Sequence, residues 1–185
     1  MNISSLREKV SHHKRKELHD SSLTHSAVLV LFTGSEDSPE ILLTRRTNKV
    51  EHHKGQISFA GGVVDDVDSH IIATALRETE EEIGLPSSEI EILGLFDDMF
   101  TYTGFIITPV IGYCRNLPIL QPNQDEVAEV IKLPFDFFFD PKNRTMKLWE
   151  RNGKEYEVYF YNYENYEVWG ATAYIIKSFV EFVLR

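Results

Sequence analysis

The chain has 185 residues, of which 42% are hydrophobic and 12% aromatic, so it is long enough to bury one sizeable core. Its net charge of −10 excludes generic nucleic-acid binding, because that function needs a basic surface to neutralise phosphates. No apolar run approaches the roughly 20 residues of a membrane helix. The single cysteine, Cys114, excludes an internal disulfide. Together with a charged N-terminus that lacks a secretory signal, it predicts a cytoplasmic protein.

A charged segment opens the chain, and Ser5 to Leu18 within it read as a short polar helix. We therefore treat residues 1–23 as an N-terminal helical extension and residues 24–185 as one main domain, since no linker, repeat or low-complexity stretch interrupts the latter. Apolar runs bounded by turn-forming residues then predict the first strands. These strands span Ala27 to Phe32 and Ile41 to Arg46.

The most informative segment is an acidic helix that is predicted to run from Ile72 to Ile83. Asp68 or Ser69 can cap its start, and Gly84 fits the left-handed position that ends a helix. At roughly 100° per residue, four side chains fall on one stripe that should face the core. These side chains are Ile72, Leu76, Thr79 and Ile83.

Three glutamates share another side of this helix, because Glu78, Glu81 and Glu82 are spaced i, i+3 and i+4. Like charges this close repel one another, so the three form either a solvated acidic face or a site for a hard divalent cation. Mg²⁺ takes carboxylate oxygens and keeps water and substrate phosphates as its other ligands. The adjacent glycines Gly61 and Gly62 allow a tight turn into the loop before the helix, so the order of elements is strand, Gly-Gly loop and carboxylate helix.

The second half of the chain is predicted to hold further strands and one amphipathic helix, Gly170 to Leu184. Asn152-Gly153 is a strong two-residue hairpin signal between two of these strands. The tyrosine-rich stretch Tyr156 to Tyr166 fits either a homodimer surface or one face of a sheet. The predicted strands are Ile90 to Asp97, Phe105 to Cys114, Glu126 to Leu133, Thr145 to Trp149 and Tyr156 to Tyr161.

The segment from Arg77 to Leu85, RETEEEIGL, resembles the second half of the Nudix hydrolase signature. That signature reads Arg-Glu-U-x-Glu-Glu-x-Gly-U, where U is apolar, and only Thr79 is off type. In the first half, Asp68 stands where the family has Glu, and eight residues instead of seven separate it from Arg77. The resemblance implies an α/β/α sandwich around a mixed β-sheet, with a loop–helix–loop metal site.

The resemblance also implies roles for individual residues in cleaving a diphosphate. Glu78, Glu81 and Glu82 would hold Mg²⁺ or Mn²⁺, and Arg77 would orient one of them. Glu81 and Glu126 are both candidates for the general base, because geometry decides which carboxylate can take the proton.

A second pattern resembles the coenzyme A pyrophosphatase branch of the family. That branch carries Leu-Leu-Thr-x-Arg-Ser, three residues, Arg, three residues, Gly, three residues and Phe-Pro-Gly-Gly. This chain keeps the spacing from Leu42 to Gly62, with Thr47 for Ser, Glu51 for the second Arg and Ala60 for Pro.

The implied reaction is hydrolysis of coenzyme A or acyl-coenzyme A to 3′,5′-ADP and 4′-phosphopantetheine. Arg45, Arg46 and Lys54 precede the motif helix and can bind the substrate phosphates, or they are ordinary solvated charges. The backbone of Gly61 and Gly62 can also approach the metal or the phosphates. Two alternatives stay open: another nucleoside diphosphate such as ADP-ribose or NADH as substrate, or a Nudix domain that binds a nucleotide without cleaving it.

Overall fold

The structure is a computed structural model that describes residues 1–49, 54–151 and 153–185. Two sequence observations lie outside those residues: Glu51 of the upstream pattern and Asn152 of the hairpin signal. In the described part of the chain, no helix is both long enough and apolar enough to span a lipid bilayer.

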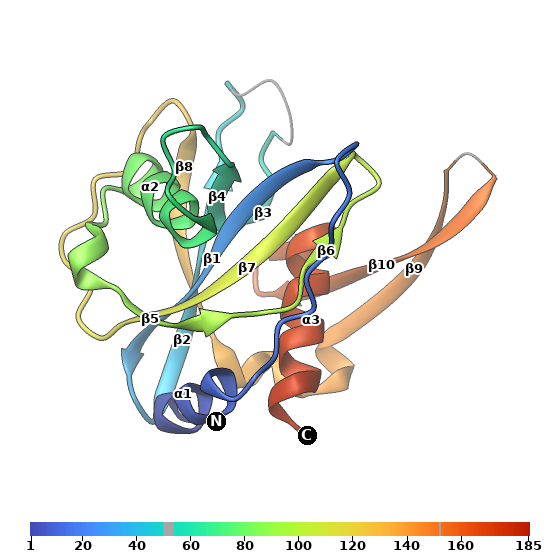
Figure 1. Ribbon diagram of the computed structural model, residues 1–185. Helices are drawn as coiled ribbons and strands as arrows, with labels where there is room; N and C mark the ends of the chain where they lie inside the picture. The colour runs from blue at the N-terminus through green and yellow to red at the C-terminus, as the bar shows by residue number, and fades with distance from the viewer. Residues whose placement is uncertain (50–53, 152) are drawn as a thin grey trace.

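A mixed sheet runs through the centre of the molecule, with helices on both of its faces (Figure 1). Helix α2 (Ile71–Ile83) covers one face, while α1 (Ile3–Ser11) and α3 (Gly170–Val183) pack against the other. This arrangement confirms the α/β/α sandwich around a mixed sheet that the sequence predicts.

Two long strands in the middle of this sheet, β1 and β7, pair in parallel from Thr24–Phe105 to Thr33–Cys114. On its other side, β1 pairs antiparallel with β4 near its start and with β2 near its end. The strands are β1 (Thr24–Ser35), β2 (Ser38–Arg46), β3 (Ile57–Ser58), β4 (Ala60–Val63), β5 (Glu91–Leu95), β6 (Met99–Phe100), β7 (Phe105–Cys114) and β8 (Val127–Pro134).

Strand β1 is apolar throughout its middle because both of its faces are buried. Leu29 and Leu31 pack on the side of α2, whereas Val30 and Phe32 belong to the cluster that includes α1 and α3. All four side chains are at most 1% exposed. Burial on both faces is typical of strands that pair in parallel, and it explains a continuous apolar run without alternation.

A second, three-stranded antiparallel sheet packs against α3 and extends away from the body of the molecule (Figure 1). It consists of β9 (Arg144–Arg151), β10 (Lys154–Tyr163) and β11 (Tyr166–Trp169), in the order β11-β10-β9. Two short 3₁₀ helices, Phe135–Phe139 and Pro141–Asn143, connect it to β8.

All the predicted strands are present, with ends that differ by a few residues, but the first helix is shorter than predicted. It ends at Ser11 instead of Leu18. Beyond it, the backbone N–H of Lys16 donates to Asp97 Oδ1 at 2.8 Å, and that of Leu18 donates to Asp98 Oδ2 at 2.9 Å. These N–H groups are therefore engaged by carboxylates from another part of the chain, and they are not available for a helical ladder.

Candidate active site

Helix α2 begins with a capping residue that differs from the predicted one. His70 is the N-cap, and its Nδ1 accepts the backbone N–H of Ala73 at 3.1 Å. The prediction of Asp68 or Ser69 was wrong, because the Asp68 carboxylate is bound by Arg77 from within the helix.

The buried side of α2 also differs from the predicted stripe. Thr79 and Ile83 are buried as predicted, whereas Ile72 and Leu76 are only half-buried. Gly84 ends the helix with a φ of 68°, which confirms the predicted left-handed cap. The remaining buried side chains are Thr74, Ala75 and Glu82, so the buried side is turned toward one of the motif glutamates.

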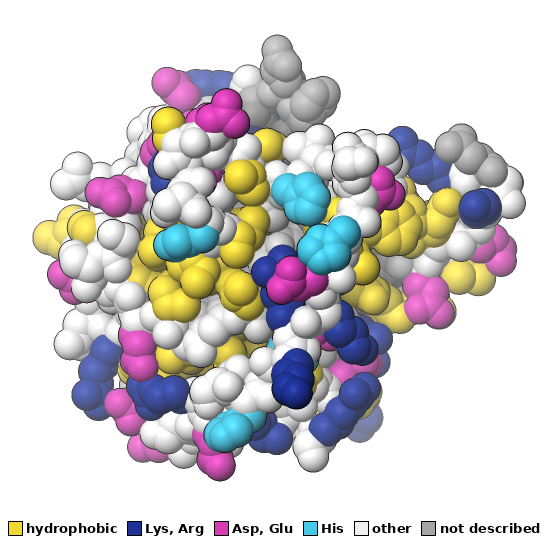
Figure 2. All heavy atoms as spheres, viewed as in Figure 1, with side chains coloured by type: hydrophobic (Ala, Val, Ile, Leu, Met, Phe, Trp, Pro, Cys, Tyr) yellow, Lys and Arg dark blue, Asp and Glu magenta, His cyan; other side chains and the backbone are white. Residues whose placement is uncertain are grey.

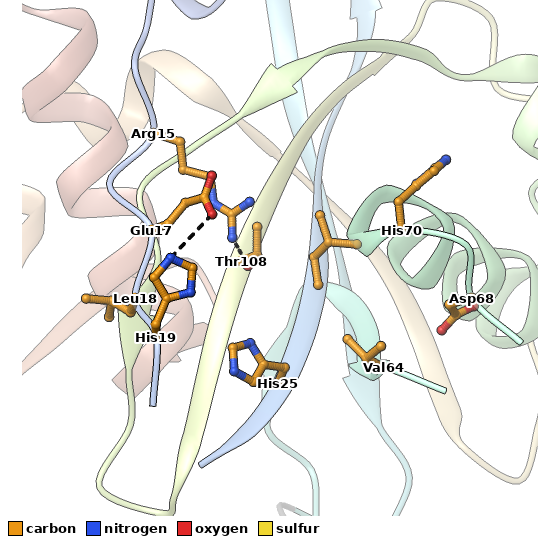
Figure 3. A pocket seen from close by; sticks show the side chains of 10 residues that line it. Arg15, Glu17, Leu18, His19, His25, Val64, Asp68, His70 and Thr108 are labelled. Atoms are coloured by element: carbon orange, nitrogen blue, oxygen red, sulfur yellow. Dashed lines mark hydrogen bonds and ion pairs between the residues drawn. The ribbon is translucent and has the colours of Figure 1, made fainter. Parts of the chain in front are cut away.

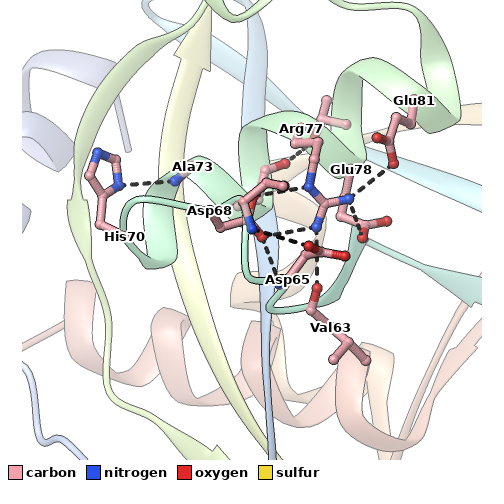
Figure 4. A network of polar contacts seen from close by, with 11 residues as sticks. Val63, Asp65, Asp68, His70, Ala73, Arg77, Glu78 and Glu81 are labelled. Carbon is pink, nitrogen blue, oxygen red and sulfur yellow. Dashed lines mark hydrogen bonds and ion pairs between the residues drawn. The ribbon is translucent and has the colours of Figure 1, made fainter.

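Arg77 joins the loop before α2 to two motif glutamates (Figure 4). Its Nε and Nη2 each donate to one oxygen of Asp68 at 3.0 Å, and Nη2 also donates to the carbonyl of Val63. Its Nη1 donates to Glu78 Oε1 at 2.8 Å and to Glu81 Oε2 at 3.0 Å. The guanidinium group holds the pKa of the buried Asp68 carboxyl well below its usual range. The extra residue before Arg77 therefore does not prevent the pairing of loop and helix.

Glu82 is buried, with only 4% of its surface exposed. Burial, together with the nearby carboxylates of Glu126 and Glu78, raises the pKa of its carboxyl to about 7. The charge of Arg46 and the backbone N–H of Gly61 act in the opposite direction. Glu82 therefore lies where two other carboxylates and one guanidinium group converge.

The turn before β8 brings Glu126 to this cluster. Asn123 Nδ2 donates to Glu126 Oε1 at 3.0 Å, and the backbone N–H of Asn123 donates to the carbonyl of Glu82 at 2.9 Å. The backbone N–H of Thr47 donates to the carbonyl of Glu126 at 2.8 Å. The turn is thus bonded both to the end of α2 and to the end of β2. Asn123 was not singled out from the sequence, because its role depends on contacts between segments far apart in the chain.

The two adjacent glycines permit the close approach of β4 to α2 and β1. A Cβ on Gly62 would lie 2.6 Å from Glu78 Oε2, and a Cβ on Gly61 would lie 2.6 Å from the Cα of Val28. Gly61 also has a φ of 154°. Only glycine fits at these two positions with this spacing of strand and helix.

The basic side chains named from the sequence lie in three different surroundings. Arg46 acts electrostatically on the buried glutamate of α2, whereas Arg45 pairs with Glu129 at 3.4 Å and lies 5.3 Å from the ring centroid of Tyr166. Lys54 is exposed in a turn. The structure therefore brings Arg46, but not Arg45, to the carboxylate cluster.

The carboxylate donors fit a hard divalent cation. Burial raises the pKa of both Glu78 and Glu82, and the neighbouring Glu126 carboxylate adds to this in each case; a divalent cation would relieve the repulsion among these carboxylates. Within residues 1–49, 54–151 and 153–185, no group of three or more acidic, histidine or cysteine side chains stands ready to hold a metal ion. Arg77 contacts one carboxylate oxygen of Glu78 and one of Glu81. To bind a metal ion, these two carboxylates would have to turn away from Arg77 or contact Arg77 and the ion together.

A separate cavity of about 290 Å³ lies between the N-terminal segment and the start of α2 (Figure 3). Arg15 in its wall is bound to Asp98 and Thr108, and Asp68 belongs both to this wall and to the Arg77 network. None of the glutamates of the carboxylate cluster lines this cavity, so the two are different sites that meet only at Asp68.

Comparison with known proteins agrees with this geometry. The NUDIX domain family matches residues 23–149. The chain is 36% identical over 166 residues to a protein of Photorhabdus laumondii named uncharacterised Nudix hydrolase NudL, covering 90% of this chain and 88% of that protein. A protein of the same name from Pectobacterium atrosepticum is 39% identical over 141 residues, covering 76% and 73%.

Two solved structures share the fold at low sequence identity. A MutT/nudix family protein from Enterococcus faecalis has a TM-score of 0.53 at 20% identity, covering 100% of this chain and 71% of that one. A C. elegans Ap4A hydrolase has a TM-score of 0.51 at 16% identity, covering 62% and 82%.

Proposed function

The chain belongs to the Nudix hydrolase family, and we propose that it is a diphosphatase that hydrolyses coenzyme A or acyl-coenzyme A with Mg²⁺ or Mn²⁺. The products would be 3′,5′-ADP and 4′-phosphopantetheine or its acyl form. The observation that carries this proposal is the pattern from Leu42 to Gly62, which resembles the coenzyme A pyrophosphatase branch. Two of its members, Arg46 and Gly62, lie beside the glutamates of α2, and this supports a role for the pattern at the same site.

Nudix hydrolases generally use divalent metal ions, and we assign Glu78, Glu81 and Glu82 as the residues that would hold one here. When bound, such an ion polarises a phosphoryl oxygen and lowers the pKa of coordinated water. Arg77 would keep Glu78 and Glu81 oriented, since it contacts both and is itself fixed by Asp68.

For the general base we favour Glu126 over Glu81. The side chain of Glu81 is 56% exposed, and one of its two carboxylate oxygens already accepts a hydrogen bond from Arg77. That oxygen would have to leave Arg77 before it could accept a proton. Glu126 instead accepts from the neutral amide of Asn123 and lies close enough to Glu78 and Glu82 to affect the pKa of both.

Arg46 is the strongest candidate for a phosphate contact. Its Nε is buried and has no hydrogen-bond partner in the described part of the chain, and a phosphate oxygen would satisfy it. The backbone of Gly61 and Gly62 can approach the same group, because neither residue has a side chain to block it. Lys54 is exposed and can add charge, whereas Arg45 is already engaged by Glu129.

A substrate panel tests this proposal. Coenzyme A, acetyl-coenzyme A, ADP-ribose and NADH would each be incubated with Mg²⁺ or Mn²⁺, and the products separated by chromatography. We expect 3′,5′-ADP from the coenzyme A substrates, and no product from Glu82→Gln with an unchanged circular dichroism spectrum. Turnover of ADP-ribose or NADH, without turnover of either coenzyme A substrate, would reject coenzyme A as the substrate. Tight binding by calorimetry without any product would instead support a domain that only binds nucleotides.

A further inference from the structure

Strand β9 lies at one edge of the three-stranded sheet and is exposed along nearly its whole length. It pairs with β10 on one side, and no strand of the described chain pairs with its other side. Leu148 is 56% exposed, Met146 47% and Trp149 46%. A long edge strand with exposed apolar side chains is a template for pairing with another chain, which soluble proteins normally avoid or use.

The exposed strand belongs to a ribbon that projects beyond α3 (Figure 1). Strand β11 pairs with β10 only from Phe160 to Tyr163, so the outer part of the ribbon has two strands. Figure 2 shows hydrophobic, basic and acidic side chains side by side on this projection. A two-stranded ribbon is marginally stable alone in water, and a further strand would stabilise it.

We propose that this ribbon is a dimerisation arm, in which β9 of one copy pairs antiparallel with β9 of a second copy about a two-fold axis at Leu148. This pairing would join the two three-stranded sheets into one continuous sheet. It goes beyond the proposed function and does not depend on the substrate.

The sequence of β9 favours a second copy of this chain as the partner strand. Residues directly opposite each other must lie on the same face of the joined sheet, so the axis must pass through a residue. With the axis at Leu148, no like charges face each other, and Leu148 meets its own copy at the centre. The facing pairs are then Lys147 with Trp149, Met146 with Glu150, and Thr145 with Arg151, each occurring twice.

The neighbouring registers are less favourable because of charge. An axis at Lys147 would set the two Lys147 ammonium groups against each other, and an axis at Trp149 would set Lys147 against Arg151. Like charges directly opposite destabilise a strand pair, whereas aromatic pairs and pairs of opposite charge stabilise it. Of the three registers centred on Lys147, Leu148 and Trp149, only the Leu148 register therefore avoids like-charge pairs, and it lets β9 pair with a second copy of itself.

The Leu148 register also extends contacts that are already present. Lys147 Nζ lies 4.5 Å from the ring centroid of Phe160, and Trp149 lies 5.4 Å from Trp169 between ring centroids. These side chains therefore gather on one face of the sheet. Pairing would place Lys147 of each copy beside Trp149 of the other and continue the same cation–aromatic packing across the axis.

Sedimentation equilibrium tests the arm. The wild-type protein is expected at twice the 21.4 kDa of one chain. Leu148→Arg would place two positive charges together at the axis and should raise the dimer dissociation constant at least about tenfold. Because Leu148 is exposed, the circular dichroism spectrum of the Leu148→Arg variant should match that of the wild type. Ile119→Arg makes the same change at a residue that is 94% exposed elsewhere, and it should stay dimeric as a matched control.

Cross-linking tests the register. Leu148→Cys should form a disulfide-linked dimer on mild oxidation, since the Cα atoms of directly opposed residues lie about 4.5–5.5 Å apart. Wild type is the control, because its Cys114 is only 1% exposed. The proposed dimerisation arm would be overturned if the wild-type protein stays monomeric at about 100 µM. It would also be overturned if Leu148→Arg leaves the dimer intact. Faster cross-linking through Lys147→Cys would overturn the register.

Discussion

Replacing Gly62 with Ala tests whether close contact between β4 and α2 holds the catalytic geometry. The added Cβ would lie 2.6 Å from Glu78 Oε2, whereas ordinary van der Waals contact begins at 3.4 Å. The Glu78 carboxylate must therefore move by about 1 Å, and a displacement of that size can lower turnover by about 10²-fold. Because Glu78 is a side chain that can turn aside, the free energy of unfolding should fall by less than about 2 kcal/mol.

Gly61→Ala provides the contrasting control. There the added Cβ would meet backbone atoms, namely the carbonyl oxygen of Ala27 and the Cα of Val28, and the φ of 154° adds strain. Those atoms belong to the pairing of β1 with β4 and cannot move aside alone. We expect the free energy of unfolding to fall by more than about 3 kcal/mol.

Both variants would be compared with wild type by urea denaturation and by metal-dependent cleavage of the substrate that the panel identifies. Gly62→Ala should keep its fold and lose turnover, while Gly61→Ala should lose its stability. Wild-type turnover in Gly62→Ala would refute the reasoning about Glu78. Unchanged stability in Gly61→Ala would refute the close packing of β4 on β1.

Two further predictions follow from the glutamates and from Arg77. The pKa of Glu82 is raised from 4.5 to about 7, so the metal-free folded protein loses stability, relative to the unfolded chain, as pH rises between these values. In urea denaturation at pH 8, metal-free Glu82→Gln should therefore be more stable than wild type by up to about 3 kcal/mol, with no such gain at pH 4. A gain that does not depend on pH would contradict the raised pKa of Glu82. Arg77→Lys should lower kcat at least about tenfold in steady-state assays, because one ammonium group cannot hold Asp68, Glu78 and Glu81 together. An unchanged kcat would show that this orientation is not needed.

Local periodicity was enough to predict α2, its end at Gly84 and the close spacing of its three motif glutamates. It was not enough to separate their surroundings, since Glu81 is exposed while Glu82 is buried. That difference depends on which side of the helix β4 approaches, and Gly61 and Gly62 allow the approach. The identity of the acidic face was therefore a local property, whereas the burial of Glu82 was a tertiary one.

Other differences arose where a distant group competed with a local preference. Asp68 is a good helix cap by residue type, but Arg77 binds its carboxylate, and His70 caps the helix instead. In the same way, Asp97 and Asp98 bind backbone groups that the first helix was predicted to use. The short strands, β3 and β6, have only two residues each and so no periodicity to detect.

The parallel pairing of β1 with β7 has a consequence for how the protein is made. Thr24 pairs with Phe105, so β1 cannot pair with β7 until α2 and β5, which lie between them in the sequence, have been synthesised. Helix α3 (Gly170–Val183), which covers one face of the sheet, follows all of the strands in the chain and is synthesised after them. Contacts this far apart in sequence close slowly, and the half-made chain exposes the apolar face of β1 while it grows. Folding of the whole domain is therefore expected to finish only after α3 has left the ribosome.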